Sequence, residues 1–120
     1  MEVRVVIAGS RHYENYAEAK QFIDGVIQRT NQGPAVIILS GGCRGADMLG
    51  ERYAIEKGYA IEKYPAQWDQ YGRSAGVKRN KTMAERCDYV ICFWDGKSRG
   101  TKAMIEYAQK EGKTVEIKYI

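Results

Sequence analysis

The chain has 120 residues, which is enough for one compact domain and too few for two, so residues 1–120 are expected to form a single domain. Its 44% hydrophobic and 28% charged residues are ordinary for a globular protein, and no apolar run approaches the roughly 20 residues needed to cross a membrane. The formal net charge of +4 excludes neither an anionic small ligand nor a nucleic acid as the partner.

Strands and helices alternate along the first half of the chain. The apolar run at residues 3–8 predicts a strand, and apolar residues recur at helical spacing over residues 16–29. Asparagine, glycine and proline within residues 31–34 predict the end of that helix. A second apolar strand is expected at residues 35–40, followed by a helix over residues 44–57 that ends before a glycine.

The same alternation continues to the end of the chain, without a repeat, a low-complexity segment or a linker. The remaining predicted elements are a short strand at 59–64, a loop at 65–72, a helix at 73–86, a strand at 88–94, a helix at 100–111 and a last strand at 114–120.

The composition of the strands predicts their order in the sheet. Residues 3–8, 35–40 and 88–94 are nearly continuous apolar runs, which is typical of parallel strands covered by helices on both faces. Residues 59–64 and 114–120 also contain Glu and Lys, so these two strands are expected at the edges. With right-handed crossovers the fold class is α/β, a Rossmann-like three-layer α/β/α sandwich whose five-stranded parallel sheet has the order 3-2-1-4-5.

Three glycine-containing turns follow strands and are therefore expected at one end of the sheet: GSRHY at residues 9–13, SGGCRGAD at 40–47 and DGKSRGT at 95–101. Glycines that only end strands would explain any one of them, whereas three together favour a binding site. Glycine permits close backbone approach, and the last two turns lead into helix N-termini, which favour an anion such as phosphate. The candidate ligand-binding residues from these turns are Gly9, Ser10, Arg11, Ser40, Gly41, Gly42, Arg44, Gly45, Asp47, Asp95, Ser98, Gly100 and Thr101.

A fourth segment, WDQYGRSAGVKRN at residues 68–80, is expected to fold over the same end of the sheet. Trp68 and Tyr71 are candidates for stacking on a base, and Arg79 and Asn80 are candidates for contacting phosphate or ribose. The alternative is that Trp68 packs into the core and that Arg79 is a solvated helix charge.

Metal and nucleophile chemistry have little support in the sequence. His12 is the single histidine and has no partner at ligand spacing, so neither a metal ion nor another cofactor is expected. The three cysteines are odd in number and lack CxxC spacing, which argues against a disulfide framework or a zinc site. Cys87 and Cys92 are expected in the core, and for Cys43 a packing role is favoured over a reactive thiol.

The motifs GSR, SGGCRGAD, PAQWDQYGRSAGVKRNKTM and DYVICFWDGKSRGT, in this order and at this spacing, resemble the YspA-like, YpsA-related branch of the SLOG superfamily. The resemblance covers nearly the whole chain. It implies a Rossmann-like sandwich similar to those of the DNA-processing protein DprA and of the LOG phosphoribohydrolases, a nucleotide-derived ligand, and a homo-oligomer, either a dimer or a larger assembly.

The chain departs from these relatives at three positions. Gln67 stands where an acidic residue is usual, and Cys43 stands where a small residue is usual. When the chain is aligned on the glycine-threonine pair of the LOG motif PGGxGTxxE, Met104 occupies the position of the glutamate that acts at the N-glycosidic bond. Glu106 lies two residues further, about 200° around a helix, and is expected to point elsewhere. These departures favour binding over catalysis, with Asp47 as the candidate catalytic residue if the protein is an enzyme.

The function expected from the sequence is binding of a phosphate- and ribose-containing nucleotide derivative, of the ADP-ribose or cyclic nucleotide type, by a sensor or a sequestering protein. Two alternatives stay open: hydrolysis of a nucleotide N-glycosidic or phosphate bond, and binding of single-stranded DNA. Because residues 1–9 predict a strand and not a targeting signal, a cytoplasmic location without membrane association is expected.

Overall fold

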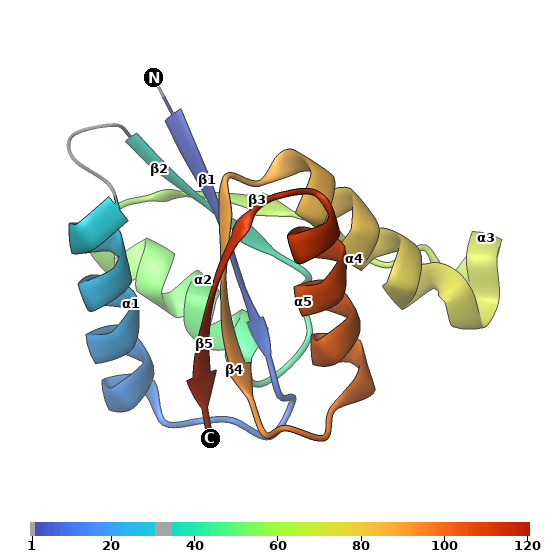
Figure 1. Cartoon of the computed structure of the whole chain (residues 1–120), viewed down its shortest axis with the longest axis horizontal. Coiled ribbons are helices and arrows are strands. Elements are labelled where there is room, and N and C mark those ends of the chain that lie inside the picture. Colours follow the sequence, from blue (N-terminus) through green and yellow to red (C-terminus); the bar gives the residue numbers. More distant parts are fainter. Residues whose placement is uncertain (1, 31–34) are drawn as a thin grey trace.

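The computed structural model describes residues 2–30 and 35–120, so the predicted helix end at residues 31–34 lies outside the described residues. Figure 1 shows the fold. Its elements in chain order are β1 (Glu2–Gly9), α1 (Tyr16–Thr30), β2 (Ala35–Ser40), α2 (Ala46–Lys57), β3 (Ala60–Lys63), α3 (Trp68–Tyr71), the 3₁₀ turn η1 (Gly72–Ser74), α4 (Ala75–Arg86), β4 (Tyr89–Trp94), α5 (Arg99–Lys110) and β5 (Thr114–Tyr119).

The five strands form one parallel sheet of order β3-β2-β1-β4-β5, which confirms the predicted topology. The three apolar strands occupy the middle, and the two strands that contain charged residues are the edges. A central strand has both faces covered by helices and therefore has no polar face, whereas an edge strand meets solvent. The order of the sheet reverses between β1 and β4.

Helices α1 and α2 cover one face of the sheet, and α4 and α5 cover the other (Figure 1). Successive side chains of a strand point to opposite faces, so each central strand contributes to both cores. Val5 of β1 packs in the same cluster as Ile23 of α1, and its neighbour Val6 packs in the same cluster as Met83 of α4. The two cores hold the strand ends in place, and these ends carry the glycine turns.

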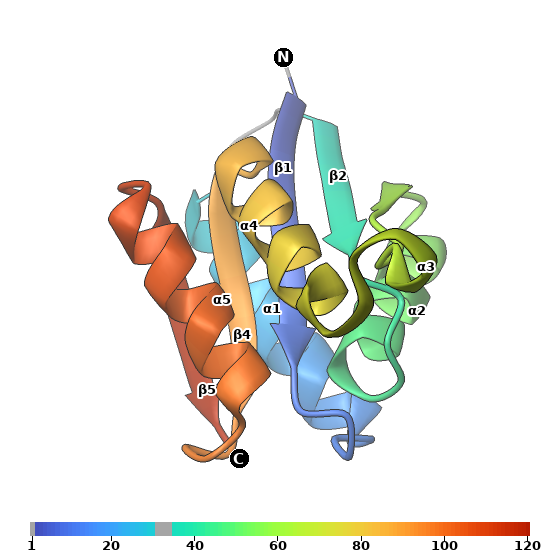
Figure 2. The ribbon, with the colours of Figure 1, turned by 90° about the vertical axis from the view of Figure 1, so that its right-hand side faces the viewer.

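The segment after β3 differs most from its prediction. Within the predicted loop at 65–72 the chain forms the short helix α3, which lies at the N-terminal end of α4 and projects from the body (Figures 1 and 2). The side chain of Trp68 is 53% exposed, so the alternative in which it packs into the core is wrong. The helix predicted from residue 73 begins at Ala75, after the 3₁₀ turn.

Cys87 and Cys92 are buried, as predicted. Tyr53 is also buried, whereas Tyr119 is exposed. Among the described residues, none of the helices combines the length and the apolar character required to cross a bilayer.

Candidate functional site

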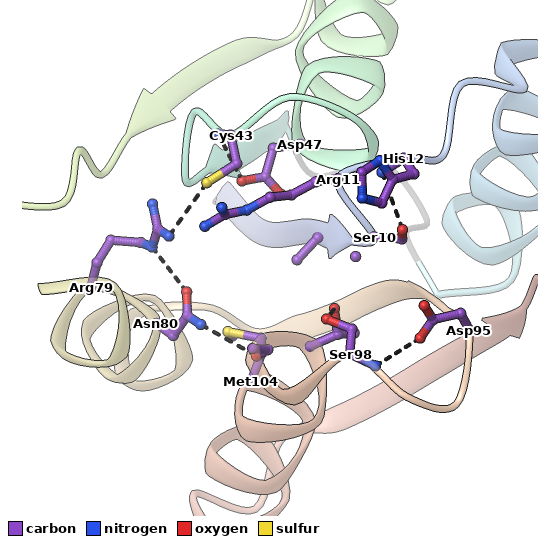
Figure 3. A pocket seen from close by; sticks show the side chains of 14 residues that line it. Ser10, Arg11, His12, Cys43, Asp47, Arg79, Asn80, Asp95, Ser98 and Met104 are labelled. Carbon is purple, nitrogen blue, oxygen red and sulfur yellow. Dashed lines mark hydrogen bonds between the residues drawn. The ribbon is translucent and has the colours of Figure 1, made fainter. Parts of the chain in front are cut away.

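A cleft of about 330 Å³ lies where the carboxyl ends of β1 and β4 meet the turn after β2, helix α4 and the start of α5 (Figure 3). This is the point at which the strand order reverses, where sheets of this class bind their ligands. The volume lies at the lower end of the range for small-molecule sites. The lining residues are Ala8, Gly9, Ser10, Arg11, His12, Cys43, Asp47, Arg79, Asn80, Asp95, Ser98, Gly100, Thr101 and Met104.

Backbone hydrogen bonds hold the turn after β1. The Ser10 N–H donates to the Phe93 carbonyl at 3.0 Å, and the Ser10 carbonyl accepts from the Ala46 N–H at 3.0 Å. The turn is therefore tied to β4 on one side and to the start of α2 on the other. Arg11, the next residue, is exposed and extends into the cleft beside Asp47 (Figure 3).

The turn after β2 uses several of its polar groups internally. The Gly42 N–H donates to Ser40 Oγ at 3.1 Å, and the Cys43 N–H donates to Asp47 Oδ2 at 3.1 Å. The Ser40 hydroxyl itself donates to Glu51 Oε2 at 2.6 Å in a buried position. Gly42 was predicted to contact the ligand, but its N–H already has an acceptor, as does the N–H of Cys43, and the turn presents the Asp47 carboxyl to the cleft.

Asp47 is the most perturbed acid of the cleft. Its side chain belongs to a residue that is only 7% exposed, and this burial raises the pKa of Asp47 from 3.8 to about 6. The Cys43 N–H and the guanidinium groups of Arg79 and Arg11 favour the charged form and partly offset the burial, whereas Glu51 adds to the rise. At neutral pH the cleft therefore contains a carboxylate that is costly to bury, which is typical of functional sites.

The N-terminus of α5 presents donors to the cleft. Asp95 Oδ1 accepts the N–H groups of Lys97 and Ser98, both at 2.8 Å, which shapes the turn before the helix and holds the pKa of Asp95 below its ordinary value. The N–H groups in the first turn of a helix have no acceptor within the helix. In α5 the N-cap residue Ser98 does not supply one either, because its side chain makes no cap hydrogen bond. The hydroxyls of Ser98 and Thr101 lie at the same end, 3.3 Å apart. This helix end has the features of an anion site.

Two residues of α4 connect the turn after β2 with α5. Arg79 donates through Nε to Asn80 Oδ1 at 2.9 Å and through its guanidinium to the Gly41 carbonyl, and it lies 3.7 Å from Cys43 Sγ. Asn80 in turn donates to the Gly100 carbonyl at 3.5 Å. Figure 3 shows this chain of contacts along one wall of the cleft.

Apolar groups form another part of the lining. Met104 of α5 is 1% exposed and lines the cleft together with Ala8 of β1. Glu106 is exposed and is absent from the lining. The position at which LOG enzymes carry a glutamate is therefore an apolar surface in this chain.

The cleft brings together a large part of the candidate site. The predicted residues that line it are Gly9, Ser10, Arg11, Asp47, Arg79, Asn80, Asp95, Ser98, Gly100 and Thr101.

The other predicted residues lie elsewhere. Ser40 is buried beneath the turn after β2, and Gly45 precedes α2. Arg44 is exposed and does not line the cleft. Two cavities next to the cleft hold the rest: Gly41, Gly42 and Trp68 line one of about 260 Å³, and Tyr71 lines one of about 370 Å³.

Four lining residues were not predicted as ligand contacts: Ala8, His12, Cys43 and Met104. His12 and Cys43 lie inside the glycine-containing turns, and their position there could have identified them as lining residues. Ala8 is an apolar residue of a regular strand, and nothing in the sequence distinguishes it from a core residue. For Met104, the alignment with the glutamate of the LOG motif was the available signal. Across residues 2–30 and 35–120, no three His, Cys, Asp or Glu side chains come together in a way that would hold a metal ion.

Comparison with protein families and curated proteins finds relatives over most of the chain. The family model of the YspA, cpYpsA-related SLOG family matches residues 3–71. The "Gene 61 protein" of Mycobacterium phage D29 is 32% identical over 115 residues, which cover 91% of this chain and 90% of the phage protein.

Two solved structures share the fold. DNA processing protein A (DprA) from Streptococcus pneumoniae matches with a TM-score of 0.75 and 19% identity over 98% of this chain. A structure of the same protein from Helicobacter pylori, concerned with its single-stranded DNA binding mode, matches with a TM-score of 0.67 and 19% identity over 96% of this chain. The chain spans 50% and 64% of these two proteins, respectively, and at this identity the likeness concerns the fold.

Proposed function

Since the chain belongs to the YspA, cpYpsA-related SLOG family, we propose that its cleft binds a phosphate- and ribose-containing nucleotide derivative, of the ADP-ribose or cyclic nucleotide type. The protein acts as a sensor of this compound or sequesters it. The observation that carries the proposal is the convergence of anion donors and one buried carboxylate in a single cleft.

The phosphate binds at the N-terminus of α5. Free N–H groups of the first helical turn and the hydroxyls of Ser98 and Thr101 lie at this end of the cleft, and the Arg11 guanidinium lines the same cleft beside Asp47. Backbone N–H groups at a helix end and a guanidinium are strong donors to phosphate oxygens. The charge of the ligand is therefore met by groups that lack a full set of partners in the free protein.

The ribose binds beside Asp47. A carboxylate accepts hydrogen bonds from ribose hydroxyls, and the amide of Asn80 on the opposite wall can both donate and accept. Met104 and Ala8 supply an apolar surface against which the sugar or base packs. This division of polar and apolar groups is typical of small-molecule sites.

A binding experiment tests the phosphate position. Titration calorimetry with AMP, ADP-ribose and 3′,5′-cyclic AMP is expected to detect at least one ligand, and Thr101→Val is expected to weaken that ligand about tenfold through loss of a hydroxyl donor. Lys102→Gln is the matched control, because Lys102 is exposed on the same helix outside the cleft. Mass spectrometry of small molecules released by mild denaturation widens the ligand panel. The proposal fails if no nucleotide binds and none is released.

The pH dependence of affinity tests the ribose position. Because burial raises the pKa of Asp47 to about 6, its carboxylate is largely protonated at pH 5 and largely charged at pH 7.5. If it accepts hydrogen bonds from ribose, affinity falls about tenfold between pH 7.5 and 5, and Asp47→Asn abolishes that dependence. A rise in affinity at low pH would instead mean that Asp47 faces the phosphate.

Hydrolysis of a nucleotide is a second candidate function, favoured by the raised pKa of Asp47 inside the cleft. It predicts that AMP or ADP-ribose releases free base or phosphate, and that Asp47→Asn abolishes turnover while largely retaining affinity. Chromatography of the reaction products decides. If no product is released from a broad panel of nucleotides, this candidate is excluded.

Binding of single-stranded DNA is a third candidate, favoured by the fold shared with DprA and by the net charge of +4. A DNA strand contacts several phosphates at once, so its affinity would fall steeply with salt and rise with strand length. A nucleotide held in one cleft shows a much weaker salt dependence. Fluorescence anisotropy with oligonucleotides of increasing length separates the two candidates.

A further inference from the structure

A second cavity, of about 370 Å³, lies between the chain that leaves β3 and the side of α4. Its charged lining residues are all basic: Lys63, Lys78, Arg79 and Arg86. The remaining lining residues are Tyr64, Pro65, Gln67, Tyr71, Ala75 and Thr82. Among the described residues, no carboxylate lines this cavity.

The basic groups of this cavity are only partly neutralised. Lys63 pairs with Glu51 at 3.6 Å. Within residues 2–30 and 35–120, neither Lys78 nor Arg86 forms an ion pair with a carboxylate. Each lies over a ring instead: Lys78 Nζ is 4.8 Å from the centre of the Tyr71 ring, and Arg86 Cζ is 5.7 Å from that of Tyr64. Positive charges gathered in a hollow repel one another, and an anion relieves that repulsion.

The spacing of the α4 residues directs them into one cavity. Lys78, Thr82 and Arg86 are separated by four residues each, so they lie on one face of the helix. Asn80, which contacts α5, lies on a different face of α4.

The second cavity adjoins the cleft at Arg79. Arg79 lines both, and a third cavity of about 260 Å³ adjoins both, because it shares Cys43 and Arg79 with the cleft and Lys63, Tyr64 and Pro65 with the second cavity. The three cavities surround the Arg79 side chain, which is held by the Gly41 carbonyl and Asn80. A ligand can therefore extend from the end of α5 past Arg79 to Lys78 and Arg86.

We propose that the ligand is a dinucleotide, with one phosphate at the N-terminus of α5 and a second between Lys78 and Arg86. This inference rests on the proposed function of the cleft and names its ligand class. The cleft contains both acidic and basic side chains, whereas the charged side chains of the second cavity are all basic. The cleft combines cations with the carboxylates of Asp47 and Asp95, which suits ribose and one phosphate, and the second cavity offers cations alone.

Arg79 lines both cavities, so its side chain lies between the two anion sites, and a dinucleotide can place the phosphates of its two nucleosides on either side of it. The aromatic rings of Tyr64 and Tyr71, at the second site, provide surfaces for the second nucleoside. A long nucleic acid strand fits less well, because the carboxylates of the cleft would repel a continuous phosphate backbone.

The test compares AMP with the linear dinucleotide pApA and with cyclic di-AMP by titration calorimetry. In the wild type, pApA or cyclic di-AMP is expected to bind at least about tenfold more tightly than AMP. The double variant Lys78→Gln, Arg86→Gln is expected to remove that advantage and to leave the affinity for AMP unchanged. Lys81→Gln, an exposed residue of the same helix outside these cavities, is the matched control and is expected to retain the advantage. Whichever of pApA and cyclic di-AMP shows the larger affinity relative to AMP indicates whether the ligand is linear or cyclic.

The possible outcomes separate the two proposals. If AMP binds and the double variant leaves both dinucleotides unaffected, the dinucleotide inference fails and the cleft remains a mononucleotide site. If the double variant weakens AMP as much as pApA, the second cavity is not a separate phosphate site and the inference also fails. If an oligothymidylate of 20 nucleotides binds much more tightly than either dinucleotide, the partner is a nucleic acid and the dinucleotide inference fails. If none of these compounds binds, and neither ADP-ribose nor 3′,5′-cyclic AMP binds either, the proposed function itself fails.

Discussion

The turns after β2 and after β4 have similar sequences and different roles. Both contain glycines and lead into a helix of twelve residues. In the turn after β2, the N–H groups of Gly42 and Cys43 donate to side chains of the same turn, and a carboxyl faces the cleft. In the turn after β4, Asp95 accepts the N–H groups that precede α5, and the first turn of α5 stays open.

The difference shows that a glycine-rich turn before a helix does not by itself make an anion site. What matters is whether the turn satisfies its own N–H groups. The turn after β2 supplies an acceptor to the cleft, and the turn after β4 supplies donors, so the two together match a ligand that has both hydroxyls and phosphate. Substitutions at matched positions of the two turns test this division.

The largest difference between the turns is expected at a glycine that precedes each helix. Gly45 has a φ of +79°, and a Cβ atom there would lie 2.3 Å from the Ser10 carbonyl oxygen, whereas Gly96, with a φ of +80°, has open space. Gly45→Ala is expected to lower the free energy of unfolding by about 3–5 kcal/mol, because backbone of the turn after β1 must move. Gly96→Ala is expected to cost about 1–2 kcal/mol for the left-handed backbone alone. Urea denaturation of both variants measures the contrast, and equal losses would contradict it.

The two aspartates are expected to give opposite pH dependences. The pKa of Asp47 is about 6 in the folded protein and lies above its ordinary 3.8, so its contribution to stability is present below about pH 4 and is lost as the pH rises to 6. Asp47→Asn is therefore expected to gain about 2 kcal/mol relative to the wild type between pH 4 and pH 8.

The pKa of Asp95 is lowered by the N–H groups of Ser98 and Lys97, so its contribution is present above its ordinary pKa and is lost as the pH falls. Asp95→Asn is expected to be less stable than the wild type at pH 7, and this difference shrinks in acid. Thermal unfolding of both variants from about pH 2 to pH 8 provides the measurement, because the contribution of Asp95 changes only below its ordinary pKa of 3.8. Parallel curves for the two variants would refute the opposite roles of the two carboxyls.

A hydroxyl substitution in the turn after β2 is expected to affect mainly stability. Ser40 donates to the buried Glu51 and accepts from the Gly42 N–H, so Ser40→Ala leaves two polar groups without their partner. The expected loss is about 1–3 kcal/mol of unfolding free energy. Chemical denaturation measures this loss. A loss below the error of that measurement would mean that water replaces the hydrogen bonds of Ser40 to Glu51 and to the Gly42 N–H.

The corresponding substitution in the turn after β4 is expected to affect mainly binding. Ser98 makes no cap hydrogen bond to α5, so Ser98→Ala is expected to change stability by less than about 0.5 kcal/mol. The affinity for the phosphate-bearing ligand is expected to fall about fivefold, because a hydroxyl donor is lost at the anion site. Calorimetric titration beside a melting curve separates the two effects, and the reverse pattern would assign Ser98 a structural role.

Sequence reasoning succeeded where burial alone decides the outcome. The order of the sheet followed from the contrast between apolar central strands and mixed edge strands, and Cys87 and Cys92 were expected in the core, where both are buried. It was less complete for the segment after β3. Trp68 lies on a projecting helix of four residues, whose position depends on contacts with α4 and not on a local periodicity.

The candidate site was predicted as a set of residues without their hydrogen-bond partners. In open parallel sheets the ligand binds at the carboxyl ends of the strands. This rule predicted the convergence of Arg11, Asp47 and Thr101. The participation of Cys43 and Met104 did not follow, since a residue's exposure to a cleft depends on the elements packed around it.

The sequence by itself determined the parallel sheet, the end of it that carries the site, and the residue types available there, because hydrophobic pattern and glycine position are local properties of the chain. Only the tertiary structure decided which donors remain free. Asp47 accepts the Cys43 N–H and approaches Arg79 of α4, and Arg79 joins three cavities, because segments distant in sequence meet at that point. Burial and hydrogen-bond saturation are properties of the packed molecule, and they divide the site into an acceptor side and a donor side.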